Sequence, residues 1–397
     1  MPGFELFGDK ERREVQQVLD TGVLMRYGFD GIREGRWKAA ELEKQLAVRM
    51  QVPYAQLVSS GTAALTVALA CAGVGAGDEV ILPTFTFVAS FEAVLALGAI
   101  PVLVDIDDTL TLAPAAVKAA VTDKTKVVMP VHMCGSMADL AALKYICVEH
   151  GLLLVEDACQ AIGGTYQGKP LGSYGDLGCF SFDYVKTITC GEGGAVIMRD
   201  VNLYRKADHY SDHGHDHRGK DRGAEGHPFM GYNFRISELH AAVGLAQLGR
   251  LDEFLKIQEK HYGILRQCLG RIQGVRFRRV PETGVENYSF LSFFLEDEAR
   301  ARKAHKALSV AGIDGCFYWF DNNWHYHRHW EHLKRAHSLS PLGKTVEASL
   351  QNQSDRDFSA SDQWMGRTVS CLIKLGWTDK EVAARGAAMA EALKKST

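Results

Sequence analysis

A short apolar run meets a glycine-rich turn in the segment Gly178-Cys-Phe-Ser-Phe-Asp-Tyr-Val-Lys186-Thr-Ile-Thr-Cys-Gly191-Glu-Gly-Gly194, and a lysine stands between them. Upstream, a carboxylate follows another apolar run in Leu152-Leu-Leu-Val-Glu-Asp157-Ala-Cys-Gln160. Apolar runs of this length, bounded by glycines or polar residues, are typical of strands buried in a sheet. We therefore expect Lys186 and Asp157 to lie at the ends of neighbouring strands.

Similar apolar runs alternate with helix-like segments from about residue 55 to 200. The expected strands are Val80–Leu82, Val102–Asp105, Lys126–Val131, Leu152–Val155, Cys179–Phe182 and Ala195–Met198, and the helix-like segments include Ala89–Gly98 and Met137–His150. Strands that are apolar on both faces and separated by helices predict an α/β fold with a mostly parallel sheet covered on both sides. Ligands of such sheets bind at the carboxyl ends of the strands.

The length of 397 residues exceeds one ordinary core and predicts two domains. We expect an N-terminal arm over residues 1–35, a large domain over 36–250 and a smaller α+β domain over 251–397. In the small domain, strands are expected near Arg276–Arg279 and Tyr288–Leu295. One long amphipathic helix, from Ser237 to beyond Lys256, is expected to join the two domains.

Composition excludes several classes of protein. The formal net charge of −3 argues against a nucleic-acid partner. No segment is long and apolar enough to span a bilayer, and the first eight residues lack the pattern of a signal peptide. The nine cysteines are scattered, with no Cys-x-x-Cys pair, which indicates reduced thiols in a cytoplasmic protein.

A lysine and an aspartate on neighbouring strand ends suit a site for pyridoxal 5′-phosphate (PLP). The lysine would form a Schiff base, and the aspartate would keep the pyridine nitrogen protonated. Ser60-Gly61-Thr62-Ala63 opens a helix whose free N–H groups suit a phosphate, although an ordinary serine N-cap explains the same pattern. Phe87, after a strand, could stack on the ring, although aromatic residues of the core are commoner.

The order of these signals resembles the DegT/DnrJ/EryC1/StrS family of PLP-dependent sugar aminotransferases. The resemblance rests on Ser60-Gly-Thr-Ala-Ala-Leu65, Glu156-Asp-Ala-Cys-Gln-Ala161, Gly175-Asp-Leu-Gly-Cys-Phe-Ser-Phe182, Lys186-Thr-Ile-Thr-Cys-Gly-Glu-Gly-Gly194 and Gly231-Tyr-Asn-Phe-Arg235 followed by Glu238-Leu-His-Ala-Ala. These stretches run through most of residues 55–255. The fold implied is that of the aspartate aminotransferase-like (fold type I) PLP enzymes.

The resemblance also implies roles for single residues. Lys186 would be the Schiff-base lysine and Asp157 the partner of the pyridinium, with Gln160 by the ring hydroxyl and Phe87 stacked on the ring. The implied phosphate contacts are Gly61, Thr62, Ala63 and Ser181. Asn233 would reach the phosphate of the neighbouring subunit's cofactor, which implies a homodimer with shared sites. Relatives with histidine at the lysine position act as dehydratases, so the lysine favours transamination.

Further stretches are similar to a narrower group in this family, the transaminases that form 8-amino-3,8-dideoxy-manno-octulosonate for lipopolysaccharide synthesis. They are Met1–Gly8, Arg36–Lys38, His132–Met137, Asp212–His217, Gly219–Glu225, Gly315–Trp319 and Asn322–Tyr326. This similarity implies L-glutamate as donor, yielding 2-oxoglutarate, and 8-oxo-3-deoxy-manno-octulosonate as acceptor. A nucleotide-keto-sugar aminotransferase of the same family is the alternative, and a non-catalytic sensor with this fold is a more distant one.

The loop Asp212-His213-Gly-His215-Asp216-His217 permits three interpretations: a metal site of a hydrolase, a solvated polar loop, or a substrate loop. We expect no metal. An acidic, hydroxylated sugar needs cationic and hydrogen-bonding groups. The candidates for these groups are His213, His215, His217, Lys220, Arg222 and Arg26. The aromatic cluster of residues 317–330 fits either a sugar-stacking surface or a domain-interface core.

Overall fold

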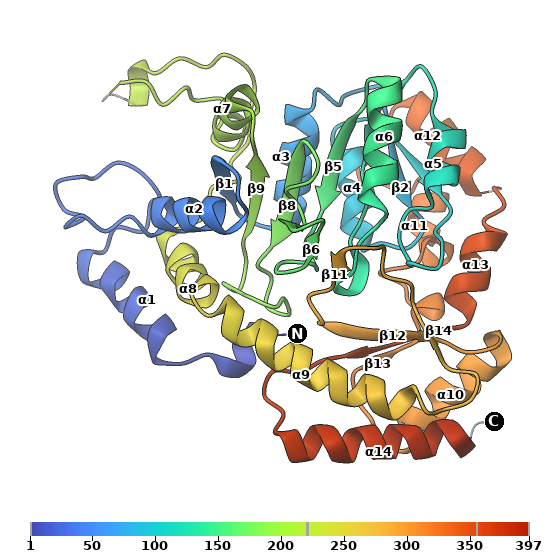
Figure 1. The fold of residues 1–397 in the computed structure, drawn as a ribbon. Coiled ribbons are helices and arrows are strands. Elements are labelled where there is room, and N and C mark those ends of the chain that lie inside the picture. The colour runs from blue at the N-terminus through green and yellow to red at the C-terminus, as the bar shows by residue number, and fades with distance from the viewer. Residues whose placement is uncertain (1, 220–221, 355, 396–397) are drawn as a thin grey trace.

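A seven-stranded sheet forms the centre of the computed structural model, which describes residues 2–219, 222–354 and 356–395 (Figure 1). The strand order is β1-β9-β8-β5-β4-β2-β3. The strands are β1 Tyr54–Val58, β2 Glu79–Pro83, β3 Ile100–Val104, β4 Thr125–Val128, β5 Leu153–Asp157, β8 Leu177–Ser181 and β9 Gly194–Met198. Parallel pairing joins five of them, β3, β2, β4, β5 and β8, and the expectation of a mostly parallel sheet is confirmed.

Strand β9 runs antiparallel to both of its neighbours, β8 and β1. The sequence did not predict this reversal, because an apolar strand reads the same in either direction. The chain turns back after β8 through the short loop that carries Lys186, so no crossover helix separates β8 from β9.

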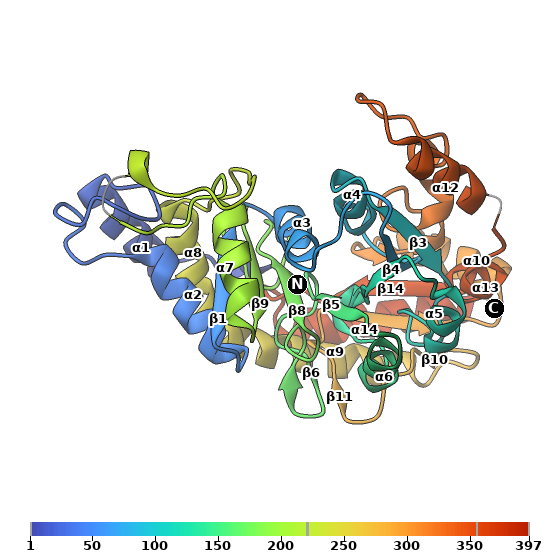
Figure 2. The same cartoon turned by 90° about the horizontal axis from the view of Figure 1, so that it is seen from above.

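Helices cover both faces of this sheet, as expected. Figure 2 shows α3 (Gly61–Cys71), α4 (Val88–Ala96) and α7 (Val201–Tyr210) on one face. The other face carries α2 (Lys38–Arg49), α5 (Pro114–Ala120), α6 (Leu140–His150) and α8 (Glu238–Leu248), with α1 (Asp9–Thr21) packed on α8. The apolar core is therefore divided by the sheet into two layers.

The helix expected from Ser237 to beyond Lys256 is in fact two helices, α8 and α9 (Leu251–Leu269). The break falls at Gly249 and Arg250. Glycine is a poor helix former, and the Arg250 guanidinium bonds the N-terminal segment at Leu6 O and Glu11. The periodic pattern continues through both helices, which explains why one helix was expected.

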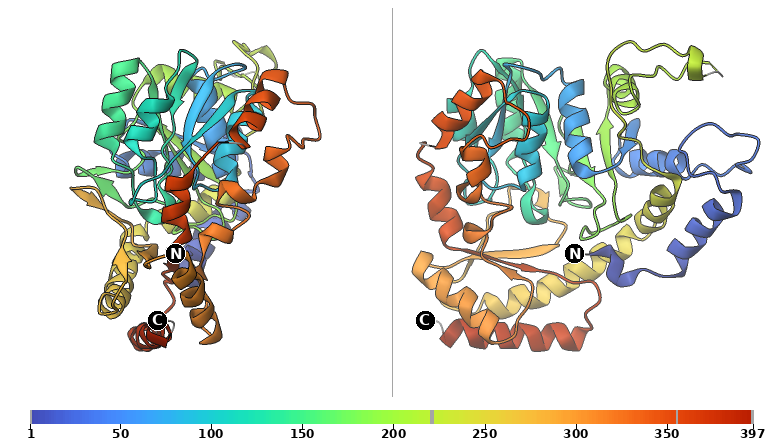
Figure 3. Two further views of the ribbon diagram at one scale, coloured as in Figure 1. Left: turned by 90° about the vertical axis from the view of Figure 1, so that its right-hand side faces the viewer. Right: turned by 180° about the vertical axis from the view of Figure 1, so that it is seen from behind.

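A second, antiparallel sheet follows, with strand order β10-β12-β14-β13. Its strands are β10 Arg276–Phe277, β12 Phe290–Phe294, β13 Cys316–Phe317 and β14 Thr368–Leu372, and α10 (Glu298–Val310) and α14 (Asp379–Lys395) pack beside it. Figure 3 shows α14 at the end of the molecule remote from residues 211–219 and 222–235. A small third sheet consists of β6 Thr165–Tyr166, β7 Lys169–Pro170 and β11 Gly284–Val285.

The chain between β13 and β14 packs against the first sheet. Helices α11 (Glu331–Lys334) and α12 (Lys344–Ser354) contribute Leu333 and Leu350 to the core beneath α3 and α4, and α13 (Ser359–Gly366) leads back to β14. The domain boundaries expected at residues 36 and 251 stay a prediction. Among the described helices, none is long and apolar enough to cross a membrane.

Candidate active site

A cavity of about 290 Å³ lies where β5 and β8 end and α3 begins. Residues predicted for the cofactor that line it are Gly61, Thr62, Phe87, Asp157, Gln160, Ser181 and Lys186. Ala63 and Asn233, which were also predicted, do not line it. Because β5 and β8 are parallel neighbours, with Asp157 paired to Cys179, the two strand ends meet at one edge of the sheet.

Helix α3 presents its N-terminus to this cavity. Ser60 is extended, and its hydroxyl accepts a hydrogen bond of 3.0 Å from the Ala63 N–H, so the N-cap interpretation of this serine is confirmed. The N–H groups of Gly61 and Thr62 stay available to an anion. Glycine is required at position 61, because a Cβ there would lie 2.6 Å from the Cβ of Ser181.

Asp157 is a buried carboxylate, only 4% exposed, at the end of β5. One oxygen accepts from the Ser90 hydroxyl at 2.7 Å and the other from the Cys159 N–H at 3.1 Å. Among the described residues it has no ion-pair partner. A buried carboxylate held by neutral donors alone is costly unless a cation joins it, and a protonated pyridine nitrogen would be that cation. The residues present therefore fit PLP.

Ser90 was not identified from the sequence. It lies on α4, and its hydroxyl also meets that of Thr86 at 2.6 Å. The only signal was a serine within a helix of alanines, valines and phenylalanine, and such a serine is equally well explained by a bond to its own helix.

Lys186 lies in the loop between β8 and β9, partly buried on the wall of the cavity. Its N–H bonds Asp183 O, and its carbonyl accepts from the Gly3 N–H at 2.9 Å. The Phe4 ring stacks on Tyr184 at 4.3 Å, so the N-terminal segment braces this loop. Within the described chain the Lys186 amine forms no ion pair, and it is thus available to a ligand.

Gln160 is fixed by the turn after β4. Its side-chain oxygen accepts from the Cys134 N–H at 2.9 Å, and Arg278 bonds the carbonyls of Met133 and Cys134. Glu286 holds Arg278 in place at 2.7 Å. The amide nitrogen of Gln160 is left as a donor on the cavity wall.

His325 also lines the cavity, and sequence reasoning did not assign it there. Its ring lies 5.3 Å from that of Phe87 and 4.6 Å from that of Trp319. Burial, and then the charge of Lys186, lower the pKa of His325 to about 3. The ring is therefore neutral at physiological pH. Its Nδ1–H donates to Asn322 Oδ1 at 2.8 Å, which leaves Nε2 as an acceptor.

The aromatic cluster divides between core and cavity wall. Trp319, Tyr326 and Trp330 are buried, whereas Trp324 is 60% exposed and stacks on Phe87 at 5.8 Å. Phe87 thus already has an aromatic neighbour on one side. The core interpretation is thus confirmed for the buried members, and the sugar-stacking interpretation stays a prediction.

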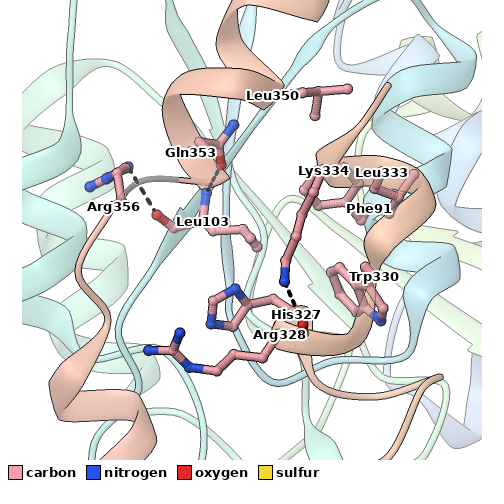
Figure 4. A pocket seen from close by; sticks show the side chains of 10 residues that line it. All are labelled: Phe91, Leu103, His327, Arg328, Trp330, Leu333, Lys334, Leu350, Gln353 and Arg356. Atoms are coloured by element: carbon pink, nitrogen blue, oxygen red, sulfur yellow. Dashed lines mark hydrogen bonds between the residues drawn. The ribbon is translucent and has the colours of Figure 1, made fainter. Parts of the chain in front are cut away.

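A smaller cavity of about 40 Å³ lies between α4, α11 and α12 (Figure 4). Its polar side chains mostly bind the protein: Lys334 bonds Arg328 O, Gln353 bonds Leu103 N, and Arg356 bonds Leu103 O. This volume holds little more than a water molecule. We therefore assign the catalytic chemistry to the cavity of about 290 Å³ that Lys186 and Asp157 line.

The lowered pKa values of two buried histidines predict that the protein loses stability in acid. Burial is the first cause that lowers the pKa of both His325 and His327 to about 3, from 6.5. The unfolded chain then binds more protons than the folded one between these values, so the free energy of unfolding falls as the pH drops from about 6.5 to about 3. His327→Gln should flatten this dependence in urea titrations between about pH 7 and pH 4. The exposed control His213→Asn should retain it, and an equal slope in both variants would contradict the prediction.

The histidine-rich loop is held together by its own ion pairs. His217 lies between Asp208 and Asp212, at 2.9 and 3.1 Å, and its bonds to these two carboxylates raise its pKa to about 9. Its contribution to stability is present at neutral pH and is lost as the pH rises through about 9. Asp212 also accepts from Tyr27 and Arg235.

Three other residues predicted for the substrate, His213, His215 and Arg26, do not line the cavity. His213 is exposed, His215 is buried, and Arg26 forms an internal pair with Glu43 at 2.7 Å. Lys220 and the side chain of Arg222 lie outside the described residues. Figures 1 and 2 show the loop beside residues 22–36, projecting together from the β1 edge of the sheet. In the part of the chain that is described, no group of three or more His, Cys, Asp or Glu could hold a metal ion.

Comparisons with known proteins show the family of this chain. The sequence model of the DegT/DnrJ/EryC1/StrS aminotransferase family matches residues 7–372. The 3-amino-5-hydroxybenzoate synthase of Amycolatopsis mediterranei (strain S699) is 39% identical, over 71% of this chain and 70% of that protein. The GDP-perosamine synthase of Caulobacter vibrioides (strain ATCC 19089 / CIP 103742 / CB 15) is 41% identical, over 66% and 68%.

Solved structures show the same fold. A crystal structure of 3-amino-5-hydroxybenzoic acid synthase superposes with a TM-score of 0.81 at 32% identity, and covers 98% of this chain and 97% of that one. DesV of S. venezuelae, in complex with a ketimine intermediate, gives a TM-score of 0.79 at 26% identity, over 97% and 94%.

Proposed function

Because the chain belongs to the DegT/DnrJ/EryC1/StrS aminotransferase family, we propose that it moves the amino group of L-glutamate to 8-oxo-3-deoxy-manno-octulosonate. At the coarser level it is a PLP-dependent aminotransferase that acts on sugars or related cyclic ketones. The observation that carries the proposal is the pairing of an available lysine amine with a buried, unpaired carboxylate across one cavity.

The residues that line the cavity would bind the cofactor, move the proton and limit the access of water. When bound, PLP supplies an electron sink for the carbon that loses a proton. Asp157 would hold the ring nitrogen in its protonated form, and the α3 N-terminus with Ser181 would bind the phosphate. The Lys186 amine would bind the cofactor and then carry the proton between donor carbon and cofactor. Leu65, Val131 and Met133 line the same cavity and would limit the access of water.

Two acceptors have support. The octulosonate is supported by the stretches Met1–Gly8, Asp212–Glu225 and Asn322–Tyr326, through their similarity to the narrower group of transaminases. A nucleotide-sugar acceptor is supported by the name of the GDP-perosamine synthase relative. A role in lipopolysaccharide synthesis and a cytoplasmic location belong to the octulosonate proposal.

An amino-transfer assay separates the two acceptors. Purified holoenzyme is first converted to its amino form with L-glutamate, and the loss of the cofactor's visible absorbance is recorded. Adding 8-oxo-3-deoxy-manno-octulosonate should restore the absorbance and release an amino sugar acid, identified by mass. GDP-linked keto sugars should have no effect. Restoration by the nucleotide sugar alone would favour the alternative, and L-glutamine in place of glutamate tests the donor.

We further propose a homodimer in which the projecting loop serves the neighbouring cavity. Lys186 is the one cationic side chain among the described residues that line the cavity, whereas glutamate and the sugar acid both carry carboxylates. Arg235 and Asn233 flank Phe234, whose carbonyl accepts from the Ser59 N–H at 2.8 Å, yet neither lines the cavity of its own chain, and Asn233 is exposed. A partner's loop could supply the missing positive charge and the phosphate contact.

Mixing two inactive variants tests the shared site. Lys186→Ala and Asn233→Ala should each be impaired alone. After dissociation and reassociation, activity should return to at most about a quarter of the wild-type rate, since half of the random dimers are mixed and one of their two sites is intact. Refolding each variant alone is the control. If mixing restores nothing although mass spectrometry detects the mixed dimer, Asn233 acts within its own subunit.

A further inference from the structure

Two cysteine thiols face each other in the second sheet, away from the active site. The sulfur atoms of Cys316 on β13 and Cys371 on β14 are 2.9 Å apart. Neither belongs to a disulfide in this structure. They are far apart in the sequence, with β12, β13 and β14 brought together only by the fold.

The register of the two strands suits a covalent bond between these residues. Cys316 is paired directly with Cys371, and the adjacent pair Gly315 and Leu372 is joined by the hydrogen bond from Leu372 N to Gly315 O, at 2.8 Å. Because hydrogen-bonded and non-hydrogen-bonded pairs alternate in an antiparallel ladder, the cysteines occupy a non-hydrogen-bonded position. The Cα atoms of such pairs are about 4.5 Å apart, within the range that disulfides span.

The two cysteines differ in their exposure to solvent and in the groups around their thiols. Cys316 is partly exposed, whereas Cys371 is fully buried. The hydrogen bond from Cys371 lowers the pKa of the Cys316 thiol, and the nearby Arg385 guanidinium lowers it further against the effect of burial. Arg385 is oriented by its bond of 2.8 Å to Asp314. Its Nε is buried without a partner among the described residues, so it can face an anionic sulfur.

We propose that Cys316 and Cys371 form a reversible disulfide in exchange with small disulfides such as oxidised glutathione. The accessible Cys316 thiolate attacks one sulfur of glutathione disulfide, which forms a mixed disulfide and expels one glutathione thiolate. Cys371 then loses its proton and attacks the Cys316 sulfur, which expels the second glutathione. The protein is oxidised by two electrons, and one glutathione disulfide is reduced to two thiols.

The position of the pair connects this site to the catalytic cavity. Strand β13 is followed directly by residues 318–325, which end at His325 on the cavity wall. A covalent bond between β13 and β14 would fix the start of that segment on the second sheet. The other partly exposed cysteines, Cys159 and Cys268, have no second sulfur at hydrogen-bonding distance among the described residues.

Peptide mapping of the oxidised holoenzyme tests the inference. The full-length protein is incubated with oxidised glutathione, free thiols are blocked with iodoacetamide, and the non-reduced digest is analysed by mass spectrometry. We expect one cross-linked pair of peptides, containing Cys316 and Cys371, that dithiothreitol removes. In Cys371→Ser, Cys316 should retain a glutathione adduct, whereas Cys316→Ser should give neither the cross-link nor an adduct at Cys371.

The control variant is Cys268→Ser, which should form the cross-link as the wild type does. Absence of the cross-linked peptides from oxidised wild-type protein would overturn the proposal. A predominant glutathione adduct at Cys159 or Cys268, with Cys316 and Cys371 both alkylated, would overturn it as well. Because the wild-type protein gives the decisive result, a variant that folds poorly does not weaken the test.

Discussion

Lys186→Ala should reduce transamination by at least about 10⁴-fold, the upper end of what one positioned proton-transfer group contributes. The loss should be larger than for any other single change in the cavity, because the same amine would both bind the cofactor and move the proton. The backbone of residue 186, which bonds Asp183 and Gly3, is unaffected by the substitution, so the loop should keep its conformation. The rate is measured as 2-oxoglutarate release with a saturating keto acceptor.

Lys186→Arg is the matched control for charge. It keeps a cation on the cavity wall, but a guanidinium does not give up its proton at physiological pH. We expect it to be as inactive as the alanine variant, while both keep the wild-type unfolding temperature in the absence of cofactor. Substantial activity in either variant would show that another base moves the proton.

Asp157→Asn should lower kcat by about 10²–10³-fold, the effect typical of removing one preorganised electrostatic contact in a buried site. Asparagine has the same shape as aspartate, its amide oxygen can accept from the Cys159 N–H and its amide nitrogen can donate to the Ser90 hydroxyl, so the geometry should survive. What is lost is the negative charge opposite the ring nitrogen. The kcat is measured as for Lys186→Ala, from the steady-state release of 2-oxoglutarate with a saturating keto acceptor.

The same variant has a second readout. Asp157 is buried without a cation from the protein, so in the cofactor-free chain its replacement should leave the unfolding temperature unchanged or higher. Ser90→Ala is the companion change, and should cost less activity because the Cys159 N–H still orients the carboxylate. A kcat equal to that of the wild type in Asp157→Asn would remove Asp157 from the mechanism.

Much of the fold could be predicted from local pattern. The strands expected around Val80, Val102, Leu152 and Ala195 were found within a few residues, because apolar runs with polar boundaries report burial directly. The reversal of β9 and the break between α8 and α9 could not be predicted. Strand direction and helix continuity depend on the packing of other segments against them, such as the N-terminal residues that meet Arg250.

The residues that could carry the chemistry are recognisable in the chain alone: a lysine and an aspartate that each follow an apolar strand, and a serine-glycine pair that opens a helix. Their partners became known from the three-dimensional fold. Ser90 reaches Asp157, His325 reaches Phe87, and Cys316 reaches Cys371 across long stretches of chain. The physical reason is that the local pattern of apolar and polar residues indicates which residues are buried. A contact, in contrast, depends on strand order and register, which the packing of the whole chain sets.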